Sequence, residues 1–320
     1  MSSSTEPDVT ETYRFKPDDL NAAGRLPGIG AFMRVKNGAD FIEATIRSHM
    51  PHLDEIVVVH NQCTDATPAI LARLAAEFGG RLRVFPYRPK VHAPGSEAHA
   101  REPADSPASF VNQSNYALTR TRYRAAMKLD DDHLAMDERL AGLTGHIRAD
   151  SYHLAKVLCF SGINLARDEK GAVGVLKREP FAGAGDHFFF EVTPETRFIH
   201  HPRFEDFHHG KPRVFTDFTY WHLKYLKPEF GFANRDIETG GNPRFERKRR
   251  EFLADRRMIS LAEVRAAAPA LIDLATMLPL PEKARLKVDR WRKFLSDPPR
   301  DAEIAAAVKA ATRRGPPARP

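Results

Sequence analysis

Three consecutive carboxylates, Asp130, Asp131 and Asp132, follow the apolar run 125–129 and precede His133. Neighbouring negative charges repel each other, and at an effective dielectric constant near 20 two of them about 4 Å apart cost about 4 kcal/mol. A cation held among them would offset this repulsion. Oxygen ligands favour Mg²⁺ or Mn²⁺, which keep part of their coordination sphere for water and substrate phosphates. The sequence therefore predicts a divalent-cation site at the end of a strand.

Two other interpretations of the acidic run are purely structural. The three residues could form a solvated turn, or Asp132 could cap a short helix that starts near Leu134. Short motifs often match by chance, so the sequence around the run has to decide between these interpretations.

The segments that surround the acidic run alternate between strand and helix patterns. Short apolar runs, several of them rich in β-branched residues, predict strands at 29–35, 55–59, 81–87 and 124–129. Helices are predicted between them, the clearest at 67–78. Strands and helices in alternation with short connections predict a parallel sheet, and ligands of such sheets bind beyond the carboxyl ends of the strands. The acidic run falls at this edge.

The overall composition limits the class of protein. A chain of 320 residues with 42% hydrophobic content can form one large α/β domain or two smaller ones. The net charge of +7 suits anionic partners such as nucleotide phosphates, nucleic acid or an acidic membrane surface. Two cysteines, Cys63 and Cys159, are too few for a disulfide framework, and a reducing cytoplasm is expected. No secretory signal or membrane-spanning segment is expected.

Three motifs in order resemble those of one enzyme family. The segment 57–67 ends with Thr64, Asp65 and Thr67 after a strand, the segment 34–37 ends in Asn37, and Asp130–Asp132 resembles an Asp-x-Asp metal motif. Together they are similar to the family 2-like glycosyltransferases of the GT-A fold. The chain departs from the family where its members usually carry the first Asp that holds the nucleotide, because His60 and Asn61 stand there.

The resemblance implies a fold and a domain division. The expected fold is a GT-A, Rossmann-like α/β domain with a mixed, mostly parallel sheet flanked by helices, followed by a helical C-terminal extension. We expect a flexible or loosely docked N-terminal extension over 1–27, a catalytic domain over 28–235, and a basic helical region with a disordered tail over 236–320.

The resemblance also implies roles for individual residues. The donor nucleotide would be bound by Asn37, His60, Asn61, Asp65, Asp130 and Asp131. The metal, Mn²⁺ or Mg²⁺, would be bound by Asp130, Asp132 and His222. Asp186 would be the catalytic base, although a loop Asp that satisfies turn amides is an equally good interpretation. Basic side chains near the phosphates are expected to include some of Arg34, Lys36, Arg88, Lys90 and Lys128, with Lys128 more suited to pointing outward.

The predicted activity is metal-dependent transfer of a sugar from a nucleotide-diphosphate-sugar to an acceptor hydroxyl on a glycan or glycolipid, with inversion. A sugar nucleotidyltransferase is the alternative enzyme, but it would need a Gly-rich phosphate loop after the first strand, which 33–37 lacks. A non-enzymatic basic protein that binds polyanions would explain the charge but not the acidic run. Nucleic acid is not an expected partner.

Two basic segments near the C-terminus, 244–257 and 283–295, have apolar residues at helical spacing. Helices of this kind can lie on anionic lipid, which would bring the enzyme to a lipid-linked acceptor at the inner face of the membrane. They can equally pack on the catalytic domain with a solvated basic face. The sequence leaves both arrangements open.

Overall fold

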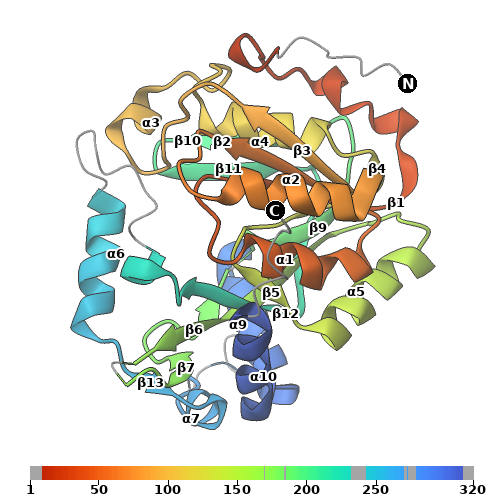
Figure 1. Cartoon of the computed structure of the whole chain (residues 1–320). Helices are drawn as coiled ribbons and strands as arrows, with labels where there is room; N and C mark the ends of the chain where they lie inside the picture. Colours follow the sequence, from red (N-terminus) through yellow and green to blue (C-terminus); the bar gives the residue numbers. More distant parts are fainter. Residues whose placement is uncertain are drawn as a thin grey trace.

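The computed structural model describes residues 9–168, 170–183, 185–231, 243–269, 272 and 279–312. Within these residues the centre is an eleven-stranded mixed sheet, flanked by helices (Figure 1). Its main path runs β13-β7-β6-β9-β4-β1-β2-β3, and β12, β5 and β8 join this path at β6 or through β12. The predicted class, an α/β protein with a mixed sheet and C-terminal helices, is confirmed.

The first half of the sheet is parallel, as predicted. Its strands are β1 (Leu26–Val35), β2 (Glu55–Asn61), β3 (Leu82–Tyr87) and β4 (Tyr123–Lys128). The helices between them are α1 (Ile42–His49), α2 (Thr67–Phe78), the short α3 (Glu97–Arg101) and α4 (Phe110–Thr119). β1 begins at Leu26 and not at the predicted residue 29, because Leu26 already pairs with Tyr123 of β4.

Beyond β4 most strand pairs are antiparallel. β9 is antiparallel to β4 and β6, β6 is antiparallel to β7 and β8, and only β12 returns parallel to β6. These strands are β5 (His133–Ala135), β6 (Val157–Arg167), β7 (Val173–Leu176), β8 (Phe181–Ala182), β9 (Phe188–Glu191), β12 (Arg213–Tyr225) and β13 (Met258–Ile259). A separate hairpin consists of β10 (Arg197–His201) and β11 (Phe204–His208). Short connections join antiparallel neighbours, whereas parallel neighbours need long crossovers.

Successive side chains of β1 enter two different cores. Ile29, Ala31 and Met33 pack under α1, α2 and α5 (Asp137–Ala149), whereas Phe32 packs under α4. This alternation follows from the pleat of a strand, which turns neighbouring side chains to opposite faces. Helices on both faces therefore explain why the strands of this half are continuous apolar runs.

Residues 9–25 lie beside α4 as a series of 3₁₀ turns, η1 (Val9–Glu11), η2 (Pro17–Leu20) and η3 (Ala22–Gly24). Leu20 is 1% exposed and belongs to the core under α4. Asn112 of α4 accepts a hydrogen bond from the backbone N–H of Phe15 and donates one to the carbonyl oxygen of Tyr13, both at 2.9 Å. The described part of the predicted N-terminal extension is thus docked on the first half of the sheet.

The C-terminal helices pack on the second half of the sheet (Figure 1). They are α6 (Pro243–Ala254), α7 (Leu261–Ala266), α9 (Glu282–Ser296) and α10 (Asp301–Thr312). Phe294 of α9 is fully buried against Phe181, and Phe252 of α6 stacks on Tyr225 of β12 with ring centroids 4.9 Å apart. The predicted disordered tail lies outside the described residues from 313 on, and the boundary at 235 falls in the gap 232–242. None of the described helices has the length and apolar character needed to cross a bilayer.

Candidate active site

A cavity of about 1020 Å³ opens beyond the carboxyl ends of β1, β2 and β4. Because these strands are parallel, the residues at their ends meet at one edge, and Asn61 and Asp130–Asp132 lie there. The antiparallel pair β5–β12 adds the next wall, since its register sets His222 opposite His133. The other walls come from the hairpin β10–β11, residues 91–94, residues 178–183 and 185–187, and the helices α6 and α9.

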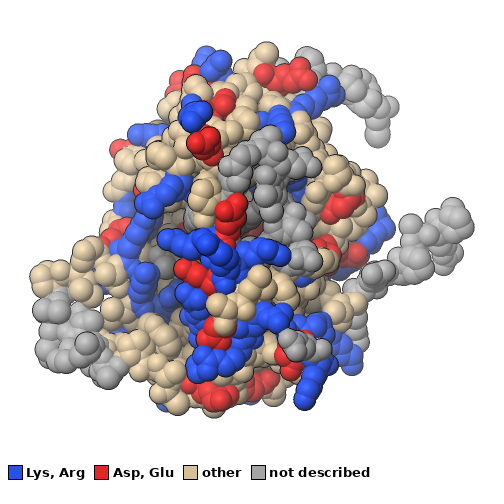
Figure 2. Space-filling view, turned by 90° about the vertical axis from the view of Figure 1, so that its left-hand side faces the viewer, with Lys and Arg blue, Asp and Glu red and all other residues tan. Residues whose placement is uncertain are grey.

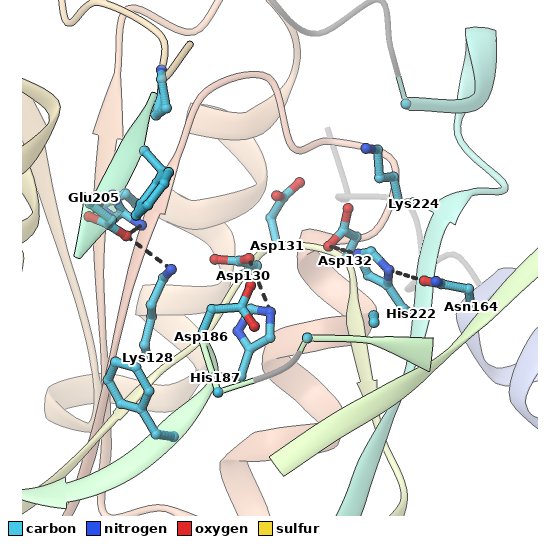
Figure 3. Close-up of a pocket in the computed structure, with 18 of the residues that line it drawn as sticks. Lys128, Asp130, Asp131, Asp132, Asn164, Asp186, His187, Glu205, His222 and Lys224 are labelled. Carbon is cyan, nitrogen blue, oxygen red and sulfur yellow. Dashed lines mark hydrogen bonds and ion pairs between the residues drawn. The ribbon is translucent and has the colours of Figure 1, made fainter. Parts of the chain in front are cut away.

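The three carboxylates of the acidic run have different neighbours (Figure 3). The Nζ atom of Lys227, a residue in the turn after β12, lies 2.9 Å from Asp131 Oδ2 and 2.9 Å from Asp132 Oδ2. Asp130 has its Oδ2 3.9 Å from His187 Nε2. One ammonium group cannot balance three carboxylates, so the run retains an attraction for a further cation.

The pKa values of the two carboxylates that share Lys227 shift in opposite directions. Burial raises the pKa of Asp131, and the adjacent Asp132 carboxylate raises it further, to about 6 in spite of Lys227. Burial also disfavours ionised Asp132, but Lys227 and His222 hold its pKa well below the usual value. Burial opposes the charge of Asp130 as well, and nearby basic groups keep its pKa lowered. Asp130 and Asp132, the predicted metal ligands, are therefore ionised at neutral pH.

His222 is oriented by two successive hydrogen bonds. Asn164 Nδ2 donates to the carbonyl oxygen of Glu179 at 2.7 Å, and this fixes the amide so that its Oδ1 lies 2.6 Å from His222 Nδ1. Nδ1 must then carry the proton, and in the neutral ring the lone pair of Nε2 faces Asp132 Oδ1 at 3.4 Å (Figure 3). A polar partner behind the ring is the usual support of a metal-binding imidazole.

The donor atoms around Asp132 fit a divalent cation. Two ligands at right angles, each about 2.1 Å from Mn²⁺ or Mg²⁺, are about 3 Å apart, and Asp132 Oδ1 and His222 Nε2 are 3.4 Å apart. The ligand atoms of Asp132, His133 and His222 all lie within 4.8 Å of one another, as do those of Asp130, His133 and His187. Both sets combine a carboxylate oxygen, a ligand that suits Mn²⁺ and Mg²⁺, with imidazole nitrogens, which suit transition metals such as Zn²⁺ and Fe²⁺.

His133, which adjoins both sets, is buried and neutral. Its ring stacks on Tyr220 with centroids 3.6 Å apart, and neither of its nitrogens has a hydrogen-bond partner among the described residues. Burial lowers the pKa of His133 well below the usual value, and the nearby His187 and His222 lower it further. A neutral imidazole with an unused nitrogen can bind a cation, whereas a protonated one cannot.

A second charged group lines the cavity beside the acidic run. Arg34 Nη1 and Nη2 donate to the two carboxylate oxygens of Glu205 at 3.0 and 2.9 Å, and Lys128 Nζ lies 3.0 Å from Glu205 Oε1. Burial opposes the charge of Glu205, but Arg34 and Lys128 hold its pKa below the usual value. The group therefore carries a net positive charge that faces the cavity.

The expectation that Lys128 points outward is wrong. Its side chain is only 11% exposed and ends at Glu205 (Figure 3). The reason is the hairpin β10–β11, which brings Glu205 to the end of β4 from far along the sequence. A buried carboxylate next to a strand end can hold a lysine that the local pattern alone would assign to solvent.

Asp186, the predicted base, lies on the cavity wall between β8 and β9 (Figure 3). The loop that carries it contains Gly183 and Gly185, whose φ values of +78° and +98° favour glycine. A Cβ on Gly185 would also lie 2.6 Å from Leu286 Cδ1 of α9. Arg290 of α9 donates to the carbonyl oxygen of Gly183. Helix α9 therefore holds the loop in place.

The predicted site residues fall into two groups. The structure brings together in the cavity Asn61, Asp130, Asp131, Asp132, Asp186 and His222. It does not bring to the cavity wall Asn37, His60 and Asp65.

The second group has structural contacts that explain its position. The carboxylate of Asp65 accepts from the backbone N–H groups of Ala39 and Thr67, both at 3.0 Å. The side chain of Asn37 accepts from the backbone N–H of Thr64 at 2.7 Å. These contacts join the turns after β1 and β2. His60 is half-buried within β2, where burial lowers its pKa.

No family model matches the chain, and no curated protein is similar to it in sequence. Its structure is similar to that of S. aureus TarS 1-349, with 13% identity, a TM-score of 0.37, and coverage of 88% of this chain and 87% of TarS. It is also similar to glucosyl-3-phosphoglycerate synthase from Mycobacterium tuberculosis in complex with Mn²⁺, uridine diphosphate and phosphoglyceric acid, with 17% identity and a TM-score of 0.28. That match covers 49% of each chain, so this chain spans about half the length of the synthase.

Proposed function

We propose that this protein is a metal-dependent glycosyltransferase of the GT-A type, which moves a sugar from a nucleotide-diphosphate-sugar to a hydroxyl on a glycan or glycolipid acceptor. The observation that carries the proposal is the pairing of Asp132 Oδ1 with His222 Nε2 at 3.4 Å inside a cavity of about 1020 Å³. Such a volume accommodates a nucleotide sugar and part of an acceptor. The acidic run at the edge of the sheet supplies the site for the cation.

The residues around the cation site would act on the leaving diphosphate. Asp132, His222 and Asp130 would hold Mn²⁺ or Mg²⁺, and the bound ion would supply positive charge to the diphosphate. Lys128 and Arg34 provide fixed positive charge on the adjacent wall. Because the diphosphate gains charge as the sugar departs, these groups stabilise the transition state more than the ground state.

The remaining predicted residues complete the mechanism. Asp186 would accept the proton of the acceptor hydroxyl while its oxygen attacks the anomeric carbon and the bond to the diphosphate breaks, with inversion. Asn61 and Asp131 would contact the donor, and Asn37, His60 and Asp65 would support the nucleotide side through the loops they join. Both cysteines are free, as expected in a reducing compartment, and we propose a cytoplasmic location.

A thermal-shift panel of nucleoside diphosphates, with and without Mn²⁺, tests the proposal. A ligand at 100 times its dissociation constant stabilises the native state by about 2.7 kcal/mol, so one diphosphate should raise the melting temperature in the presence of Mn²⁺. Asp132→Asn should abolish this shift, whereas Asp150→Asn, an exposed carboxylate at the end of α5, should retain it. If no diphosphate gives a Mn²⁺-dependent shift in the wild-type protein, the proposal is wrong.

A further inference from the structure

The cavity carries more positive charge than the proposed donor can balance. Among the described residues, eleven Lys and Arg side chains line it against seven Asp and Glu side chains. A nucleotide sugar brings roughly two negative charges on its diphosphate, and a divalent cation cancels them. The surplus of positive charge therefore remains when donor and metal are bound. Figure 2, which views the molecule from the side of α6, shows Lys and Arg gathered at the centre of this face.

Several of the cavity cations already have carboxylate partners. Lys128 and Arg34 pair with Glu205, Lys227 with the acidic run, Arg178 with Glu251, and Arg213 with Glu282. Four others form no ion pair with a carboxylate in the part of the chain that the structure describes. These four are Lys248 of α6 and Lys283, Lys287 and Arg290 of α9.

The three basic residues of α9 form a row along one side of the helix. Lys283, Lys287 and Arg290 are spaced i, i+4 and i+7, so they share a face, and all three line the cavity. The helix cannot turn this face away, because Leu286 and Phe294 are both 0% exposed in the core. The row is therefore fixed in the wall.

Each end of the row lies over an aromatic ring of a strand. Lys283 Nζ lies 5.2 Å from the centre of the Phe204 ring in β11. Arg290 lies over Phe181 at 5.1 Å and donates to the carbonyl oxygen of Gly183, in the loop that carries Asp186. Arg290 Nε is buried and has no hydrogen-bond partner among the described residues. A donor that is buried without a partner is costly unless a ligand satisfies it.

We propose that this basic row, Lys283, Lys287 and Arg290, together with Lys248, binds a phosphate group of the acceptor. The inference rests on the proposed function and adds the class of acceptor, a hydroxyl compound that carries phosphate. A phosphate offers several oxygens to several cations at once, and its charge removes the repulsion among them. With the phosphate on the row, the rest of the acceptor extends towards Asp186, which places its hydroxyl beside the proposed base.

Calorimetric titration with glycerol 1-phosphate tests the inference. The protein is first saturated with Mn²⁺ and the nucleoside diphosphate that gives the largest thermal shift, so that phosphate cannot enter the donor site. The variant Lys248→Gln/Lys283→Gln/Lys287→Gln should bind glycerol 1-phosphate at least about tenfold more weakly than wild type, since it loses three of the four cations. The control Lys156→Gln/Lys170→Gln/Lys309→Gln removes the same charge from exposed positions outside the cavity, and its affinity should change less than about twofold.

Each alternative outcome has a defined meaning. The inference would be overturned if both triple variants bound glycerol 1-phosphate equally weakly, if glycerate bound as well as glycerol 1-phosphate, or if the wild-type protein did not bind it. These results would leave the diphosphate shift, and so the proposed function, intact. Loss of the diphosphate shift in the cavity variant would assign the row to the donor and also overturn it. The phosphate could belong to a lipid or to a soluble molecule, and binding to vesicles that contain phosphatidylglycerol is compared with binding to glycerol 1-phosphate. Preference for the vesicles identifies a lipid-borne phosphate, and preference for the soluble ester identifies a free one. Both results support the inference.

Discussion

Lys227 occupies a position between two carboxylates that a cation would otherwise take. Its Nζ lies 2.9 Å from both Asp131 and Asp132, while His222 approaches Asp132 from another direction. The lysine therefore lowers the negative charge that a divalent cation meets.

Replacing Lys227 by Met should strengthen Mn²⁺ binding. The positive charge that opposes the incoming cation is removed, and we expect an affinity about fivefold higher in the absence of nucleotide. Free Mn²⁺ measured by electron paramagnetic resonance gives this affinity directly. Lys156→Met, at an exposed position, is the control and should leave the affinity unchanged. Weaker binding in Lys227→Met would mean that the lysine organises the carboxylates for the metal.

Asn164 offers a second test at the scale of one residue. Asn164→Leu removes the acceptor behind His222 Nδ1, and loss of such a partner typically costs about 10–100-fold in metal affinity. Asn164→Asp keeps an oxygen at this position and should retain binding close to that of wild type. Mn²⁺ titration of both variants measures the difference. Equal affinities in the two would show that His222 does not need this support.

The local sequence predicts where the acidic run lies but not which residues surround it in the cavity. The position of Asp130 and Asp132 at the cavity could be predicted because they directly follow a strand of a parallel sheet, and their role as metal ligands stays a prediction. Asn164, Glu205 and Lys227 could not be predicted, since each comes from a different strand or turn and only the fold brings them into the same cavity wall. Asn37 and Asp65 matched a motif, yet their side chains bond to neighbouring backbone.

At the scale of elements, the hairpin β10–β11 contacts β1 through the ring of Phe198 on Phe32 and through one buried carboxylate, Glu205, which pairs with Arg34. Glu205→Gln would leave Arg34 and Lys128 without their counter-charge, and breaking a buried pair in this way costs about 3–5 kcal/mol. Urea unfolding at pH 7 should detect this loss. Glu77→Gln removes a similar contact to Arg47 on the surface and should cost at most about 1 kcal/mol.

The difference in stability between wild type and Glu205→Gln should depend on pH. The pKa of Glu205 is lower in the folded protein than in the unfolded chain, so its stabilising effect is present above the unfolded pKa and is lost as pH falls towards the folded value. The stability difference between wild type and Glu205→Gln should therefore shrink as the pH falls below about 4.3. A difference that stays constant on acidification would show that Glu205 is not ionised in the native state.

Helix α9 can be tested through its buried face. Leu286→Ala should destabilise the protein by about 2–5 kcal/mol, because the side chain is fully buried beside the Asp186 loop. Leu253→Ala on α6, where the side chain is 42% exposed, is the matched control and should have a small effect. Chemical denaturation measures both. Similar values for the two would mean that α9 is loosely attached.

Elements that contact their neighbours in sequence could be predicted more fully than elements with long-range contacts. The strands β1 to β4 were evident because their apolar runs and crossover helices are contiguous in sequence. The pairing of strands in the antiparallel half could not be predicted, since which strand pairs with which depends on long-range register. The basic C-terminal helices were predicted, but not that α9 would form a wall of the cavity.

At the scale of the whole molecule, contact with a membrane is expected to be electrostatic. The apolar side chains Leu286, Phe294 and Phe252 are buried against the protein and cannot insert into lipid in the folded state, whereas Leu253 is 42% exposed and is a single side chain. We expect no sedimentation with neutral vesicles, and with anionic vesicles a binding that disappears at about 0.5 M salt, where charges are screened within a few ångströms. Binding to anionic vesicles that persists in high salt would show that an apolar segment inserts after all.

The wall that α9 contributes also has a consequence for biosynthesis. Residues 283–290 are translated after every acidic residue that the structure describes in the cavity wall, yet Leu286 and Arg290 contact Gly185 and Gly183 of the loop that carries Asp186. A chain still attached to the ribosome can thus form the parallel strands but not the finished cavity. The proposed sugar transfer would then begin only after the last helices have emerged and docked, and chains that end before residue 283 should lack it.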